Sequence, residues 1–151
     1  ATNQSNLPIL EAIMARSLRR ARAVLDATLI ERLESLAGAA LARLPEVAYP
    51  LVNKLTSAKL VPPARLPADV VTIGSRLSYR DELTGRSQQV TLAWPEHADI
   101  SRGIVSILTP VGVALLGLSA GDRFRWTTRA GEERALTVLT VSAERTHATE
   151  A

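Results

Sequence analysis

The chain has 151 residues, of which 46% are hydrophobic and 22% charged, enough for one domain or for one small domain with an appendage. The absence of cysteine excludes disulfide bonds, thiol catalysis and zinc sites of the cysteine type, and the two histidines, His97 and His147, do not predict a metal site. The net charge of +3 arises in residues 1–60, which hold eight basic and five acidic side chains, because residues 61–151 hold ten of each. No apolar run approaches the roughly 20 residues of a membrane span. The N-terminus does not resemble a signal peptide, so we expect a cytoplasmic protein without membrane contact.

The first predicted element is a helix over about residues 7–25, with Asn6 as its cap and Pro8 in the first turn, where a missing N–H costs nothing. It carries an apolar stripe (Leu10, Ile13, Met14, Leu18, Ala21 and Leu25) and a basic cluster (Arg16, Arg19, Arg20 and Arg22). The stripe must pack against the rest of the chain or against a second copy, so a homodimer through this helix is one hypothesis. The cluster is either a solvated helix face or a surface for an acidic partner, including a weak contact with DNA phosphates.

The pattern of residues 28–60 predicts a helical hairpin in the form of a short coiled coil. Together with the first helix, this hairpin makes residues 1–60 a helical region. Thr28 and Glu31 have the spacing of a capping box, and apolar residues recur at helical spacing after them. Pro45 is expected to end the first helix, and Pro50 to lie in the first turn of the second. The short connection, residues 43–47, makes the two helices antiparallel. Arg43 and Glu46 therefore lie at the tip of the hairpin.

Residues 61–68 contain three prolines and predict an extended linker. From residue 69 to 145 the pattern changes to short strands separated by turns, with expected strands at residues 70–79, 89–94, 104–108, 124–126 and 136–141. A short helix is expected between the third and fourth strands. Thr109 would cap it, Pro110 would be its first residue, and Gly117 would end it. The sequence thus predicts an α+β fold in which an antiparallel sheet of about five strands curls around one short helix. Residues 146–151 are expected to be a tail.

Several sequence strings in residues 69–141 resemble the C-terminal domain shared by the Gre transcript-cleavage factors and Rnk, the regulator of nucleoside diphosphate kinase. The order and spacing of the strings carry the resemblance, and the helical hairpin stands where the family has its N-terminal finger. The strings cover residues 69–73, 75–76, 79–81, 84–85, 92–95, 107–112, 114–117, 121–122 and 136–139.

This resemblance implies an FKBP-like domain that docks on RNA polymerase at the rim of its secondary channel, with the hairpin pointing into the channel. The family docks through the loop before the short helix, which corresponds here to Leu108, Thr109 and Pro110. Gre factors use a pair of acidic tip residues to help hold a catalytic magnesium ion, since magnesium prefers oxygen ligands. Here the tip offers one carboxylate, Glu46, with Arg43 nearby. We therefore expect a regulator closer to Rnk, with no cofactor and no transcript-cleavage activity.

The sequence is compatible with two other functions. An FKBP-like fold raises the possibility of a peptidyl-prolyl isomerase, which needs an aromatic-lined pocket, but the spacing of Tyr79, Trp94, Phe124 and Trp126 suits core packing. The other is an interaction or nucleic-acid-binding module that uses the N-terminal helix. The sequence has no phosphate-binding glycine motif, and Ser75 and Ser106 have no histidine near them in the sequence, so we expect no enzyme.

Overall fold

The computed structural model describes residues 22–128 and 130–145. The helix expected over residues 7–25 lies outside the described residues as far as residue 21, and the predicted tail at 146–151 also lies outside them. At the expected end of that helix the structure has a strand, β1 (Val24–Asp26). The helix prediction is therefore wrong at Leu25, which is buried within β1. Pairing with another strand overrides the local helical pattern.

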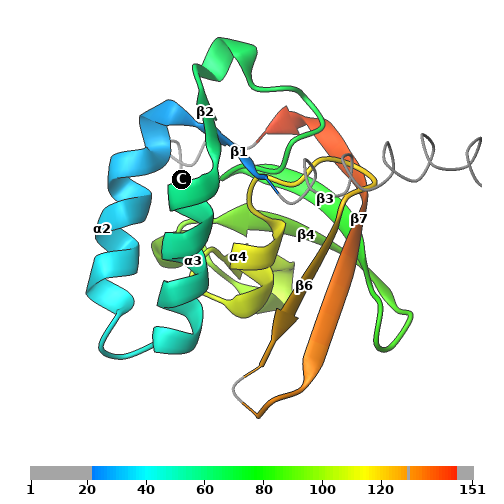
Figure 1. The fold of residues 1–151 in the computed structure, drawn as a ribbon. Helices are drawn as coiled ribbons and strands as arrows, with labels where there is room; N and C mark the ends of the chain where they lie inside the picture. The colour runs from blue at the N-terminus through cyan, green and yellow to red at the C-terminus, as the bar shows by residue number, and fades with distance from the viewer. Residues whose placement is uncertain (1–21, 129, 146–151) are drawn as a thin grey trace, which may run out of the picture.

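Two helices, α2 (Ile30–Ala40) and α3 (Pro45–Ser57), pack side by side (Figure 1). Their beginnings differ from expectation. The capping box is wrong, because Asp26 accepts the N–H of Thr28 at 2.9 Å and caps a 3-10 turn, η1 (Ala27–Leu29), ahead of α2. Pro45 is itself in the first turn of α3, while Pro50 lies inside that helix and not in its first turn. The connection between the helices is consequently residues 41–44.

The segment after α3 forms a strand where helix and linker were expected. This strand, β2 (Lys59–Val61), pairs in parallel with β1, with Leu25 opposite Leu60. The 3-10 turn η2 (Pro63–Arg65) follows it. Sequence periodicity could not indicate β1 and β2, because each has only three residues and its partner lies on the other side of the helix pair.

A five-stranded sheet makes up most of the rest of the fold. Its strands are β3 (Ser75–Asp81), β4 (Ser87–Ala93), β5 (Ile104–Ser106), β6 (Arg123–Thr127) and β7 (Glu133–Arg145), in the order β5-β4-β3-β7-β6. The expected number of strands is confirmed, but the fully antiparallel arrangement is wrong, since β5 runs parallel to β4. The 3-10 turns η3 (Pro95–His97) and η4 (Ile100–Arg102) lie between these two strands and return the chain to Thr91 in the second half of β4, which pairs with Ile104 at the start of β5.

The short helix α4 (Pro110–Leu115) contacts α3 on one side and β5 and β6 of the curled sheet on the other (Figure 1). One cluster of buried residues joins the helix pair, α4 and the sheet. It includes Leu33, Ala37, Val47, Leu51, Leu55, Leu77, Leu92, Leu115, Leu116, Leu136 and Val138. Arg32 of α2 also stacks 4.0 Å above the ring of Trp94 and forms an ion pair with Glu96. The helix pair therefore packs along its length against the rest of the fold and is not a free-standing stalk.

No helix in residues 22–128 and 130–145 is long and apolar enough to cross a membrane.

Candidate partner-binding site

The start of α4 is held by several local hydrogen bonds. The Thr109 hydroxyl accepts the N–H of Gly112 at 3.0 Å and donates to the carbonyl of Ser106 at 2.8 Å. The N–H of Leu108 donates to the Ser106 hydroxyl at 3.0 Å, and Pro110 takes the first turn of the helix. This is the capped helix start that the sequence predicted. Leu108 and Thr109 are half-buried and Pro110 is exposed, so Pro110 is the member of this loop that is most open to a partner.

Gly112 allows α4 to lie close to β5. A Cβ atom at this position would lie 2.2 Å from the carbonyl oxygen of Ser106 and 2.9 Å from the Cα of Ile107. Both of these are backbone atoms, which cannot swing aside as a flexible side chain would. The loop before α4 is therefore fixed by close packing as well as by hydrogen bonds.

The start of α3 is less constrained. Leu44 occupies the N-cap position and makes no side-chain capping bond, and Glu46 lies exposed in the first turn. Arg43 is also exposed, and neither charged side chain forms an ion pair or hydrogen bond with another described residue. The carboxylate of Glu46 is favourable here because the start of a helix carries partial positive charge.

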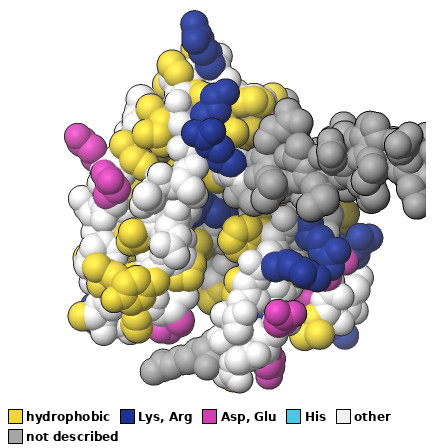
Figure 2. All heavy atoms as spheres, viewed as in Figure 1, with side chains coloured by type: hydrophobic (Ala, Val, Ile, Leu, Met, Phe, Trp, Pro, Cys, Tyr) yellow, Lys and Arg dark blue, Asp and Glu magenta, His cyan; other side chains and the backbone are white. Residues whose placement is uncertain are grey.

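The tip also exposes large apolar side chains. Tyr49 is 60% exposed, Leu41 38% and Leu44 37%. In Figure 2 hydrophobic side chains gather at the lower left, over the end of the helix pair where this tip lies. Apolar side chains grouped on an exposed loop are typical of a protein contact.

The starts of α3 and α4 meet at one small groove, with a cavity volume of about 20 Å³. It is lined by Glu46, Val47 and Pro50 from α3, by Pro110, Val113 and Ala114 from α4, and by Phe124, Trp126 and Thr127 from β6. Two residues that the sequence assigned to separate sites, Glu46 and Pro110, thus share one surface. Arg43, Leu108 and Thr109 do not line it.

The aromatic residues fall into two groups. Tyr79 and Trp94 are buried, as their spacing predicted, whereas Phe124 and Trp126 are half-buried and line the groove. Phe124 and Trp126 also pack against the core, as their spacing suggested, but they line the groove as well. Strand alternation places both on one face of β6, and that face meets the helices.

Lys54 is a residue that the sequence reading did not single out. It lies in α3, is only 6% exposed, and donates to three carbonyl oxygens near the end of α4: Val113 at 2.6 Å, Leu116 at 2.8 Å and Ala114 at 2.9 Å. Its Nζ also lies 4.3 Å from the centre of the Phe124 ring. Carbonyls at a helix end lack partners within the helix, so this one side chain caps α4 and ties it to α3.

The protonation of Lys54 is unusual. Burial lowers the pKa of its ammonium group to about 7. The three carbonyl oxygens match the three N–H groups of the charged form, and the aromatic ring also attracts a cation. A signal was present in the sequence, because Lys54 is three residues after Leu51 and one before Leu55, on the buried side of the helix.

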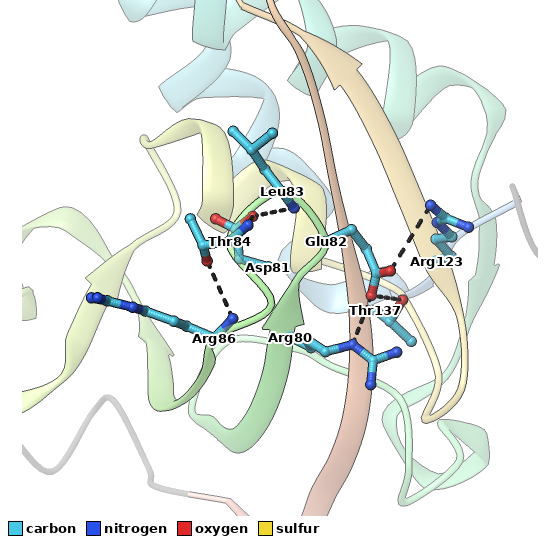
Figure 3. A network of polar contacts seen from close by, with 8 residues as sticks. All are labelled: Arg80, Asp81, Glu82, Leu83, Thr84, Arg86, Arg123 and Thr137. Carbon is cyan, nitrogen blue, oxygen red and sulfur yellow. Dashed lines mark hydrogen bonds and ion pairs between the residues drawn. The ribbon is translucent and has the colours of Figure 1, made fainter.

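A second polar cluster lies on the outer side of the sheet (Figure 3). Glu82 accepts hydrogen bonds from Arg80 at 2.9 Å and Thr137 at 3.1 Å, and lies 4.0 Å from Arg123. The hydrogen bond from Arg80 is the main reason that the pKa of Glu82 is lowered. Arg134 pairs with Asp81 at 2.6 Å. This cluster connects the β3–β4 turn to β6 and β7, and none of its charged side chains lines the groove.

Within the described ranges, 22–128 and 130–145, no group of three or more histidine, aspartate or glutamate side chains could hold a metal ion.

Comparison with known proteins relates this fold to one family. Residues 66–143, just over half of the chain, match the family described as transcription elongation factor, GreA/GreB, C-term. The regulator of nucleoside diphosphate kinase of Escherichia coli K12 is 38% identical over 93 residues, which cover 62% of this chain and 68% of that protein. GreA of Solidesulfovibrio magneticus is 34% identical over 70 residues and is covered over only 43% of its length. A GreA/GreB structure from Nitrosomonas europaea matches 80% of this chain and 99% of its own, with 31% identity and a TM-score of 0.63.

Proposed function

Because the chain belongs to the family that shares the GreA/GreB C-terminal domain, we propose that it binds RNA polymerase and regulates transcription at the polymerase secondary channel. The E. coli regulator of nucleoside diphosphate kinase is 38% identical to this chain and is covered over 68% of its length, which favours the Rnk side of the family. The sheet curled around α4 would be the FKBP-like docking domain of this family. A polymerase partner implies a cytoplasmic protein that acts by binding and not by catalysis.

The groove between α3 and α4 is the proposed contact. The observation that carries this proposal is that Glu46 and Pro110 line the same groove. The family resemblance assigns one of these residues to the hairpin tip and the other to the docking loop. A partner that covers the groove would touch both, together with Phe124 and Trp126. Leu108 and Thr109 would act mainly by holding Pro110 in place.

We further propose that the protein does not stimulate transcript cleavage. The start of α3 presents one carboxylate, Glu46, and the connection before it contributes none. The resemblance to Gre factors implies a pair of acidic tip residues that help hold the magnesium ion, and this tip supplies one member of such a pair. In addition, the tip of the helix pair packs beside α4 and does not extend from a stalk, which limits its reach. Two ideas from the sequence stay predictions, a homodimer through residues 1–21 and a weak DNA contact by their arginines.

The test is binding of the purified chain to RNA polymerase in competition with a GreA protein. We expect the native chain to bind and to displace GreA. The variant Pro110→Glu should lose this ability, because it places a charge in the groove, while glutamate is well tolerated at the start of a helix. Pro63→Glu is the matched control, since Pro63 is also an exposed proline at a helix start but lies in η2. A native chain that neither binds nor competes would overturn the proposal.

A further inference from the structure

Strand β6 is an edge strand with an unused row of backbone groups. It pairs with β7 on one side only, and the N–H of Val138 donates to the carbonyl of Asp122 while that of Thr128 donates to Glu132. In an antiparallel pair the residues that exchange hydrogen bonds alternate along the strand. Residues 122, 124, 126 and 128 therefore face β7, and the N–H and C=O groups of Arg123, Arg125 and Thr127 point outward. Among the described residues, no backbone hydrogen bond outside the β6–β7 ladder uses these outward groups.

The two faces of β6 differ in chemistry. On one face Phe124 and Trp126 line the apolar groove against α3 and α4. On the other face Arg123, Arg125 and Thr127 are exposed. They line a second hollow together with Trp126, Glu82, Leu83, Glu133, Arg134 and Ala135, so Trp126 and Thr127 border both hollows. A strand added at this edge would place alternate side chains over these two faces, since side chains alternate along a strand.

The charges of the outer hollow favour an acidic partner. Its lining has three arginines and two glutamates. Arg134 is already paired with Asp81 and Arg123 lies 4.0 Å from Glu82, so Arg125 is the arginine of this hollow that forms no ion pair with a described residue. Arg125 lies opposite Ala135 in the β6–β7 register, so no carboxylate faces it across the pair. A second copy of this chain is a poor occupant, because edge-to-edge pairing would bring like-charged arginines together.

We propose that β6 binds an extended acidic segment of a partner protein, which adds to the sheet as a sixth strand. Its backbone pairs with Arg123, Arg125 and Thr127. Its acidic side chains lie over Arg123 and Arg125, and the alternate apolar side chains lie beside Phe124 and Trp126. Backbone pairing gives such a contact its affinity, and the two faces give it specificity. The added strand would share Phe124 and Trp126 with the proposed polymerase contact, but its test requires no polymerase.

The test uses NMR of the full chain with a capped peptide of alternating glutamate and valine, against the same peptide with lysine in place of glutamate. We expect the glutamate peptide to slow the hydrogen exchange of the Arg123, Arg125 and Thr127 amides, and the lysine peptide to leave them unchanged. No binding, equal binding of both peptides, or protection elsewhere on the chain would overturn the proposal. So would self-association through β6 in the absence of peptide.

Two variants sharpen the result. Thr127→Pro removes an outward N–H without breaking the β6–β7 ladder, and it should weaken binding about tenfold, the size of one lost hydrogen bond whose partner stays unpaired. Arg125→Glu should abolish binding of the glutamate peptide and permit binding of the lysine peptide. Arg86→Glu, an exposed arginine in the β3–β4 turn, is the matched control and should bind like the native chain. Unchanged binding in both edge variants would contradict the assignment to β6.

Discussion

The starts of α3 and α4 line the same groove and each begins with a proline, yet they are built differently. Thr109 caps α4 and Gly112 lets it lie close against the β5 backbone, so this start is fixed. Leu44 does not cap α3, and Leu41, Leu44 and Tyr49 remain exposed around it. The two helix starts therefore have different roles in the proposed contact. The α4 start is a rigid surface, and the α3 start keeps exposed apolar and charged side chains for a partner.

The largest expected effect comes from the packing of α4. Gly112→Ala should lower the free energy of unfolding by about 3 kcal/mol, because the new methyl group collides with backbone that cannot move aside. Gly38→Ala in α2 is the matched control, since a Cβ at Gly38 would meet nothing within 4 Å. Alanine there should stabilise the protein by about 0.5–1 kcal/mol through its higher helix propensity. Denaturant unfolding of both variants checks the contrast, and similar effects would argue against a rigid α4 start.

The contact of Lys54 in α3 with the end of α4 should affect how the stability of the protein depends on pH. Since burial lowers the pKa of Lys54 to about 7, between pH 7 and about 10 the unfolded chain binds a proton that the folded chain has released. Stability should therefore rise with pH in this window through Lys54, by at most about 1.4 kcal/mol per pH unit.

Lys54→Met should remove this rise, because methionine has no group that titrates between the folded and unfolded states. Lys59→Met, at an exposed lysine in β2, should retain the native pH dependence. Urea unfolding of the three proteins across pH 6–10 is the measurement. A native pH profile in Lys54→Met would show that Lys54 is not the titrating link.

The smallest effects concern the caps. Thr109→Ala should destabilise the protein by about 1 kcal/mol, because the N–H of Gly112 loses its acceptor. Leu44→Ser should have the opposite sign, a gain of about 0.5 kcal/mol, since it supplies the cap that α3 lacks. If the α3 start is kept uncapped for a partner, Leu44→Ser should also bind polymerase more weakly. If Leu44→Ser gained both stability and affinity for polymerase, the proposed role of an uncapped α3 start in binding would be contradicted.

Much of this architecture could be predicted from local pattern. Alternation along β3 and β4 and the Thr109–Pro110 signal at α4 needed no knowledge of the fold, since each is set within a few residues. The pairing of β1 with β2 depends on the helix pair that lies between them. The parallel pairing of β5 with β4 depends on the two 3-10 turns between them. Neither leaves a periodic signal.

The candidate site was predictable in its parts but not as a whole. Pro110 and Glu46 stood out singly, one as a helix start and one as a tip carboxylate. Only the packing of α3 on α4 brings them to one groove, and that packing relies on Lys54, a charged residue at an apolar position. The role of Phe124 and Trp126 was missed because alternation indicates which face of a strand they share, and not whether a helix covers that face completely.

The central claim is that the starts of α3 and α4 form one binding surface, and a double-mutant cycle in polymerase affinity tests it most directly. Glu46→Ala and Pro110→Ala would be measured singly and together, with Glu34→Ala, at an exposed glutamate of α2, replacing Glu46→Ala in a control cycle. Residues that share a contact show a coupling of about 0.5 kcal/mol or more, whereas distant residues are additive. We predict coupling between positions 46 and 110 and additivity in the control cycle. Additive losses at 46 and 110, or no loss at either, would contradict the account.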